Sequence, residues 1–199
     1  MKSPKKSLGQ NYLIDKNIIK KIISQVEVNN KNIIEIGPGK GALTDEILLH
    51  NPKSLQIIEK DFNLSKNLEK KYFKQGNLVI FNQDILKFNL EKICKKNSII
   101  FGNLPYNISS QILVKILRFR KWPPNVTDFV LMFQKELGEK IIGKFLTPSY
   151  GRLSILTDLK LKVLNKFKVS NNSFFPKPKV TSMVLHFQPK KKLFLKLKT

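Results

Sequence analysis

Short apolar runs alternate with amphipathic stretches along the first two thirds of the chain. Five of these runs have the length and the branched or aromatic residues of buried strands: residues 32–36, 55–58, 78–81, 99–101 and 129–133. Helix-like stretches fall among them, notably residues 16–26, 42–49 and 135–142. Alternating strands and helices predict an α/β fold, in which a mostly parallel sheet carries helices on both faces.

The pattern changes from Tyr150 onward. A helix-like stretch at residues 153–159 is followed by two alternating runs, residues 162–169 and 180–187, which a loop at 171–179 joins. We expect these two runs to form a C-terminal β-hairpin that closes one edge of the sheet. The sheet would then have seven strands.

A glycine-rich turn follows the first of these strands, where the sequence reads Gly37-Pro38-Gly39-Lys40-Gly41. Strand, glycine turn and helix together form a layout that binds nucleotides. Gly37, Gly39 and Ala42 also satisfy the dinucleotide pattern G-x-G-x-x-A, so a nicotinamide enzyme is one alternative. Pro38 argues against it, because a pyrophosphate needs backbone N–H donors and proline has none. The turn suits a nucleoside cofactor without phosphates, such as S-adenosylmethionine.

Acidic residues come at the ends of the next two strands. Glu59 lies 22 residues after Gly37, where doubly wound folds place the acid that binds ribose hydroxyls. Asp84 follows the third strand; we expect it to accept a hydrogen bond from an adenine amine while Ile85 covers the ring. Either acid alone is more typical of a solvated loop. Their placement at successive strand ends favours a ligand site there, since ligands of open α/β sheets bind at the carboxyl ends of the strands.

The turn Asn103-Leu104-Pro105-Tyr106 follows the fourth strand. An adenine that reacts at its amine needs a flat stacking partner, which Tyr106 offers, and hydrogen-bond acceptors for the amine. The side-chain oxygen of Asn103 and a backbone carbonyl of Leu104 or Pro105 are such acceptors. Taken alone, the four residues also fit an ordinary turn at the end of a strand.

Together these motifs resemble the rRNA adenine N6,N6-dimethyltransferase family, and in particular its bacterial small-subunit (16S) members. The resemblance implies a Rossmann-like, S-adenosylmethionine-dependent methyltransferase fold that covers nearly the whole chain. The runs Asn-Leu-Pro-Tyr-Asn-Ile-Ser and Tyr-Gly-Arg-Leu-Ser are its most specific parts. The matching segments are residues 6–13, 35–39, 58–59, 83–84, 102–109, 134–136, 150–154 and 174–180.

The resemblance also implies roles for individual residues. Phe174 becomes the second stacking aromatic, on the opposite face of the target adenine from Tyr106; without the family, Phe174 and Phe175 both resemble core residues. The implied catalytic residues are Asn103, Leu104, Pro105, Tyr106 and Phe174. The implied cofactor-binding residues are Asn11, Leu13, Gly37, Gly39, Glu59, Asp84, Ile85 and Asn103.

Composition points to a polyanionic partner. The chain has 37 Lys and Arg against 14 Asp and Glu, a formal net charge of +23. Only three of the basic residues are arginine, so an AT-rich coding bias toward lysine is an alternative origin of the charge, although it does not explain the scarcity of acids. We expect small-subunit rRNA, or the assembling small subunit, as the partner.

Several classes of protein do not fit the sequence. No signal peptide or membrane-spanning run is expected, and the single cysteine, Cys94, fits a reducing cytoplasm. His50 and His186 lack the spacing of metal ligands, so no metal site is expected. The length of 199 residues fits one domain in a monomer.

The domain organisation expected from the resemblance has three parts. A basic arm at residues 1–15 lies over the cofactor, and residues 16–188 form the catalytic domain. A basic tail at residues 189–199 takes the place of the small helical domain that the family usually carries. That domain contributes to rRNA docking in the family, so substrate choice is left open. Either the basic tail and surface substitute for the domain, or the chain is a truncated product that keeps cofactor binding with weakened activity.

Two other functions compete with small-subunit dimethylation. A methyltransferase acting on large-subunit rRNA shares the Asn-x-Pro-Tyr turn, and the modified rRNA position would distinguish the two. A non-catalytic rRNA-binding assembly factor would need neither Asn103 nor Tyr106 nor Phe174, all of which are present. A dehydrogenase is a more distant alternative.

Overall fold

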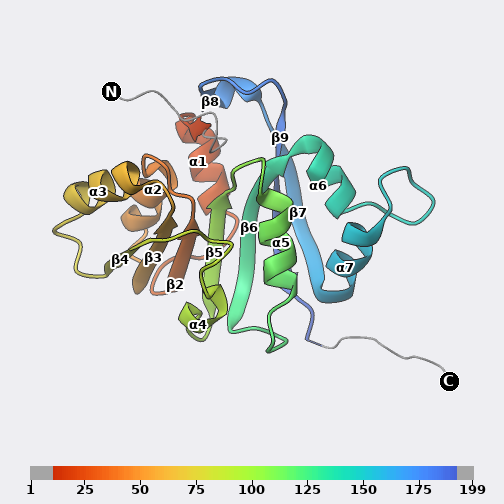
Figure 1. Cartoon of the computed structure of the whole chain (residues 1–199), viewed down its shortest axis with the longest axis horizontal. Coiled ribbons are helices and arrows are strands. Elements are labelled where there is room, and N and C mark those ends of the chain that lie inside the picture. The colour runs from red at the N-terminus through yellow and green to blue at the C-terminus, as the bar shows by residue number, and fades with distance from the viewer. Residues whose placement is uncertain (1–10, 192–199) are drawn as a thin grey trace.

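A seven-stranded sheet organises the chain in the computed structural model, which describes residues 11–191 (Figure 1). Its strands run in the spatial order β4-β3-β2-β5-β6-β9-β7. The strands are β2 (Asn32–Ile36), β3 (Ser54–Glu59), β4 (Leu78–Asn82), β5 (Ser98–Asn103), β6 (Val126–Gln134), β7 (Leu161–Val169) and β9 (Ser182–Pro189).

The pairing confirms the predicted mostly parallel sheet with a C-terminal hairpin. Strands β4, β3, β2, β5 and β6 are mutually parallel, as expected for strands joined through helices. β9 pairs antiparallel with both β6 and β7, so it lies between them and β7 forms the edge. The carboxyl ends of the parallel strands therefore meet along one side of the molecule.

Helices cover both faces of this sheet (Figure 1). They are α1 (Lys16–Ile23), α2 (Ala42–Leu49), α3 (Phe62–Lys71), α4 (Leu90–Ile93), α5 (Ser109–Leu117), α6 (Lys135–Ile141) and α7 (Arg152–Lys160), with a 3₁₀ turn η2 at Asn171–Ser173.

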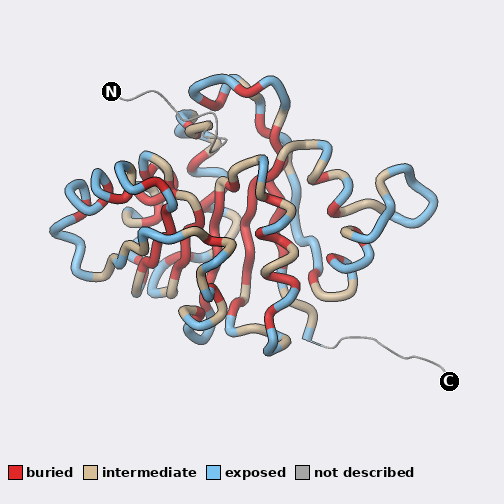
Figure 2. The backbone as a smooth tube through the Cα atoms, in the orientation of Figure 1, coloured by how far each residue is buried: buried red, intermediate tan, exposed pale blue. Residues whose placement is uncertain are grey.

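The core lies on the two faces of the central strands, where Figure 2 shows continuous burial. Side chains alternate along β2, so Ile33 belongs to the core cluster that includes residues of α1, α2 and α3, whereas Ile34 and Ile36 belong to the cluster that includes residues of α4, α5 and α6. Each of these isoleucines is fully buried and contributes about 1.5–3 kcal/mol. The strand ends are thereby held between two rigid layers.

Helix α1 is shorter than the predicted helix at residues 16–26. It begins at a cap, since Asp15 accepts hydrogen bonds from the N–H groups of Asn17 (3.0 Å) and Ile18 (3.2 Å). It ends at Ile23, after which the N–H groups of Gln25 and Val26 bond three residues back and tighten the chain into a turn. This turn redirects the chain toward β2.

A separate two-stranded pair was not expected from the sequence. β1 (Tyr12–Leu13) pairs antiparallel with β8 (Phe174–Phe175), with Tyr12 opposite Phe175 and Leu13 opposite Phe174. The pair ties the N-terminal segment to the loop before β9. Most of the expected basic arm (residues 1–15) and most of the expected basic tail (residues 189–199) lie outside the described residues.

Candidate active site

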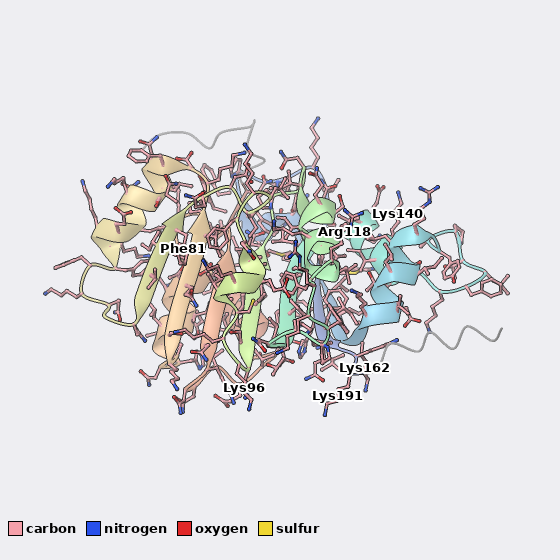
Figure 3. The ribbon with its side chains drawn as sticks, turned by 60° about the horizontal axis from the view of Figure 1, so that its bottom comes forward. Phe81, Lys96, Arg118, Lys140, Lys162 and Lys191 are labelled. Carbon is pink, nitrogen blue, oxygen red and sulfur yellow. The ribbon has the colours of Figure 1, made fainter. Side chains whose placement is uncertain are left out.

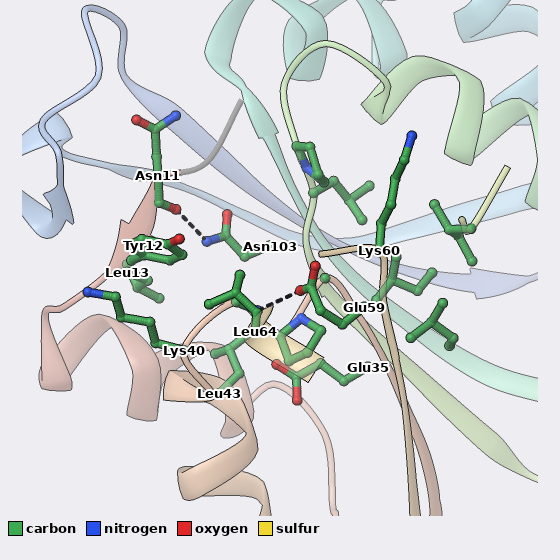
Figure 4. Close-up of a pocket in the computed structure, with 18 of the residues that line it drawn as sticks. Asn11, Tyr12, Leu13, Glu35, Lys40, Leu43, Glu59, Lys60, Leu64 and Asn103 are labelled. Atoms are coloured by element: carbon green, nitrogen blue, oxygen red, sulfur yellow. Dashed lines mark hydrogen bonds between the residues drawn. The ribbon is translucent and has the colours of Figure 1, made fainter. Parts of the chain in front are cut away.

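A pocket opens at the carboxyl ends of β2, β3 and β5 and beside the segment that follows β4 (Figure 4). Its walls come from the glycine turn, the Asn103–Tyr106 turn and the N-terminal segment at Asn11–Leu13. The predicted site residues that line it are Asn11, Leu13, Gly37, Gly39, Glu59, Ile85, Asn103, Leu104, Pro105 and Tyr106. Asp84 and Phe174 are the two predicted residues that do not.

The glycine turn and the Asn103–Tyr106 turn lie against each other although they are far apart in sequence. Their strands are neighbours in parallel register, with Ile36 opposite Gly102. Gly102 allows the Leu104 side chain to fold back over it, because a Cβ on Gly102 would lie 2.6 Å from that side chain. Gly39 has a φ of +59°, and a Cβ there would lie 3.0 Å from the Tyr12 ring. Close approach of backbone and side chains thus shapes the pocket.

Glu59 ends β3 as a nearly buried carboxylate, 7% exposed. Its Oε1 accepts the N–H of Asp61 at 2.8 Å. Its Oε2 accepts the N–H of Gly39 at 3.2 Å (Figure 4). Burial raises the pKa of this carboxyl, an effect that the two backbone N–H donors oppose. A carboxylate has about four lone-pair sites, so capacity remains to accept from the two hydroxyls of a ribose.

Asn103 has its side-chain amide oriented by the N-terminal segment. The amide nitrogen Nδ2 donates to the backbone carbonyl of Asn11 at 3.2 Å (Figure 4). A carbonyl oxygen only accepts hydrogen bonds, so the nitrogen must face it and Oδ1 must be the other atom of the amide. This contact uses the nitrogen and leaves Oδ1 as the atom of Asn103 that can accept a hydrogen bond.

Tyr106 is half-buried, and its hydroxyl lies 2.6 Å from the Ser182 hydroxyl at the start of β9. Burial raises the pKa of the Tyr106 phenol, so it is neutral at physiological pH. The Ser182 contact restrains the ring from its far end, which leaves the ring as a fixed flat surface in the pocket wall. No sequence signal identified Ser182, because it is simply the first residue of an alternating strand.

Glu35 lines the pocket beside the glycine turn and is 1% exposed. The Thr44 hydroxyl donates to it at 2.6 Å, and burial raises the pKa of its carboxyl from 4.5 to about 8. Glu35 is therefore predominantly protonated at neutral pH in the folded protein, whereas it is ionised in the unfolded chain.

This pKa difference predicts how stability depends on pH. Between pH 4.5 and 8 the folded state holds a proton at Glu35 that the unfolded state has lost, so stability falls as pH rises through that window. Glu35→Gln keeps the shape without the titration. At each pH we take the free energy of unfolding of Glu35→Gln minus that of the wild type. We expect this difference to increase by up to about 1.4 kcal/mol for each pH unit across the window. Urea unfolding of both proteins at pH 5.5, 6.5 and 7.5 checks this; parallel pH profiles would contradict it.

Asp84 lies next to the pocket with its carboxylate engaged elsewhere. Its Oδ1 accepts the N–H of Leu86 at 2.9 Å, and its Oδ2 pairs with Lys60 Nζ at 2.9 Å. The Lys60 ammonium and the Leu86 N–H hold the pKa of Asp84 below its usual value. The neighbours of Asp84, Gln83 and Ile85, line the pocket in its place. Adenine binding by Asp84 stays a prediction.

Phe174 differs in placement from the sequence expectation. Its side chain is 3% exposed and packs in the core with Leu13, its partner across the β1–β8 pair. Phe175, which the sequence suggested as a core residue, is instead 58% exposed. Adjacent residues of a strand point to opposite sides, so pairing with β1 decided which of the two is inside. The stacking role of Phe174 therefore stays a prediction.

Further lining residues escaped the sequence reasoning. Tyr12 lies between two predicted residues in the N-terminal motif, and Lys60 lies between Glu59 and Asp61. Lys40, on the glycine turn, sits over the Tyr12 ring with its Nζ 4.8 Å from the centroid. Tyr12 and Lys40 lie inside recognised motifs and Lys60 directly follows one, and this was the available signal.

Two negative observations apply to residues 11–191. Within this range no three His, Cys, Asp or Glu side chains are grouped as metal ligands would be. None of the helices described there is long and apolar enough to cross a membrane.

Comparison with known proteins gives a family and relatives. The chain matches the family model "Ribosomal RNA adenine dimethylase" over residues 1–199. It is 44% identical over 196 residues to ribosomal RNA small subunit methyltransferase A of Pelagibacter ubique, covering 96% of this chain and 72% of that protein. The protein of the same name from a Wolbachia of Drosophila simulans is 41% identical over 191 residues, covering 94% and 68%.

Solved structures show the same fold. A dimethyladenosine transferase from Plasmodium falciparum superposes with a TM-score of 0.79 at 33% identity, over 92% of this chain and 65% of that one. The 23S rRNA methyltransferase ErmE superposes with a TM-score of 0.78 at 26% identity, over 93% and 72%. The chain thus spans about two thirds of the length of these proteins.

Proposed function

The chain belongs to the ribosomal RNA adenine dimethylase family, and from this we propose that it dimethylates the N6 amine of adenines in small-subunit rRNA. The methyl donor of this family is S-adenosylmethionine. The observation that carries the proposal for this chain is the Asn103 amide, whose nitrogen is held by the Asn11 carbonyl so that its oxygen is left as an acceptor, in the pocket that Tyr106 and Glu59 also line. We further propose residues 16–188 as the catalytic domain of a cytoplasmic monomer.

The pocket has the chemistry that the cofactor needs. Glu59 would accept from the ribose hydroxyls, while Gly37 and Gly39 let the backbone approach the nucleoside closely. Ile85 and the N-terminal residues Asn11 and Leu13 would cover the bound molecule. S-adenosylmethionine supplies a methyl group that its sulfonium already activates.

The adenine amine is a weak nucleophile, and the residues of the Asn103–Tyr106 turn compensate for this. The amine lone pair is delocalised into the ring, and acceptors on the two N–H groups favour a tetrahedral nitrogen. Asn103 Oδ1 would be one acceptor and the Leu104 or Pro105 carbonyl the other, with no strong base required. Tyr106 would hold the base plane, and Pro105 stiffens the turn.

A second methylation acts on an amine with one remaining N–H. One of the two acceptors must then be dispensable, since only one hydrogen bond can still form. If monomethyladenosine accumulated as the sole product under excess cofactor, the claim that one acceptor is dispensable would be contradicted.

The choice of small-subunit rRNA rests on the named relatives and on charge. The relatives at 41–44% identity are small-subunit methyltransferases, whereas the ErmE likeness is 26%. A net charge of +23 favours a polyanionic substrate, with affinity that falls as salt rises.

A methyl-transfer assay tests the function. The protein is incubated with radiolabelled S-adenosylmethionine and unmethylated small ribosomal subunits, the rRNA is digested, and the nucleosides are separated. Labelled dimethyladenosine is the expected product. Large subunits serve as the matched substrate control: label in large-subunit rRNA alone would support the large-subunit function, and label in neither, with cofactor binding intact, would support an assembly factor.

A further inference from the structure

A second, open groove lies beside the active-site pocket, between α5 and the segment that follows β4. Its polar lining residues include Lys87, Asn89, Gln111, Lys115, Arg118 and Arg120. Residues close together in the sequence line the pocket and the groove: Ile85 lines the pocket while Leu86 lines the groove, and Ile108 lines the pocket while Ser110 lines the groove. The groove therefore begins next to the pocket and follows α5 away from it.

The groove is positively charged on its accessible side. Lys87, Arg118 and Arg120 are exposed, and Figure 3 shows Arg118 beside α5. Lys115 crosses the groove and donates to the Leu86 carbonyl at 2.8 Å, which holds the two walls together.

The one acidic side chain in the lining, Glu91, is engaged by the backbone. Its two oxygens accept the N–H groups of Arg120 at 3.0 Å and Lys121 at 2.9 Å. This contact anchors the turn that follows α5 and so holds the backbone that carries both arginines. The acid thus has a structural partner, and the exposed charges of the groove are positive.

Arginine is rare in this chain, which makes its position informative. Only three of the 37 basic residues are arginine, and two of those three, Arg118 and Arg120, line this groove. A coding bias toward lysine explains many lysines but not two arginines in one groove. The planar guanidinium binds a phosphate through two parallel hydrogen bonds, which lysine cannot do.

We propose that this groove binds the sugar–phosphate backbone of the RNA strand that flanks the target adenine. Arg118 and Arg120 contact phosphates, and Lys87 faces the same strand from the opposite wall. Helix α5 has nine residues, about 13 Å, which matches roughly four nucleotides stacked ~3.4 Å apart. The inference rests on the proposed function, because it takes RNA as the substrate and the pocket as the place where the adenine reacts.

Direct RNA binding tests the groove independently of methyl transfer. Binding of the full chain to single-stranded rRNA fragments is measured between 50 and ~200 mM salt for the wild type and for Arg118→Gln/Arg120→Gln. We expect affinity to fall about tenfold and the slope of log K against log salt to become shallower by about 1.4, the value for two lost phosphate contacts. Photocrosslinking of the same RNA should label residues 86–91 and 110–120.

Two further variants separate the groove from general charge. Lys70→Gln/Lys74→Gln removes two charges on and after α3, which packs on the other face of the sheet, and should change the slope less. Arg118→Lys/Arg120→Lys keeps the charge and should retain most of the slope. If the urea unfolding midpoints of the variants match that of the wild type, unfolding does not explain a tenfold weaker binding.

The proposal would be overturned if Arg118→Gln/Arg120→Gln and Lys70→Gln/Lys74→Gln lost RNA affinity equally. Crosslinks to residues outside the groove alone would also overturn it. Cofactor binding is followed in every variant. RNA binding through the groove without dimethyladenosine formation would sink the proposed function alone, whereas methylation that is insensitive to the arginine pair would sink the groove alone.

Discussion

Asn103→Ala should lower methyl transfer to small-subunit rRNA by at least about 100-fold, comparable to the loss of one preorganised hydrogen-bond partner in other active sites. The Asn11 carbonyl holds the Asn103 nitrogen, which leaves Oδ1 as the acceptor atom of the amide before substrate binds. Alanine removes that acceptor and leaves the Asn11 carbonyl without this donor. Initial rates of label incorporation, at saturating cofactor and RNA, measure the loss.

A matched asparagine provides the control for this experiment. Asn125 also donates its side-chain amide to a backbone carbonyl, that of Cys94, at 3.3 Å, and it lies outside the pocket. Asn125→Ala makes the same chemical change and should leave the rate within about twofold, typical of a surface substitution. If Asn103→Ala transfers methyl groups as fast as Asn125→Ala, Asn103 is not the acceptor.

The second large effect concerns the cofactor. Glu59→Gln should weaken S-adenosylmethionine binding by about 100-fold, or ~2.7 kcal/mol. Both carboxylate oxygens accept backbone N–H groups, from Asp61 and from Gly39, and an amide can place an oxygen toward only one of them. The NH₂ group of the glutamine then faces one of these two N–H donors, and the repulsion distorts the glycine turn. An NH₂ group also cannot accept a hydrogen bond from a ribose hydroxyl. Isothermal titration calorimetry measures the Kd.

Glu27 offers a control with the same local geometry. Its Oε1 accepts the N–H of Asn29 at 3.0 Å, two residues ahead, just as Glu59 accepts from Asp61, but it lies outside the pocket. Glu27→Gln should bind the cofactor as the wild type does.

The pH dependence of cofactor binding gives an independent check on Glu59. Burial raises the pKa of Glu59, so binding should weaken as pH falls and begin to do so at a higher pH than an exposed glutamate would allow. If the affinity for S-adenosylmethionine did not change down to pH 4.5, or if Glu59→Gln did not alter that affinity, Glu59 would not bind the cofactor.

The sequence alone determined where along the chain the strands of the main sheet lie, that the sheet is mostly parallel with a C-terminal hairpin, and the edge where the site lies. Periodicity is a local property, and short β-branched runs such as residues 32–36 report burial on both faces wherever the strand ends up. The convergence of Gly37, Glu59 and Asn103 also followed from the sequence, because the carboxyl ends of parallel strands meet at one edge.

The tertiary structure decided the contacts between segments that are distant in sequence. Asn103 is oriented by a carbonyl 92 residues away, and Tyr106 is restrained by a serine 76 residues away. Pairing of β1 with β8 turned Phe174 inward and Phe175 outward, a choice that alternation alone leaves open. Lys60 and the Leu86 N–H engage the Asp84 carboxylate. Each of these contacts depends on which segments pack together. The periodicity of a sequence predicts helices and strands, but it does not specify which distant segment each of them will contact.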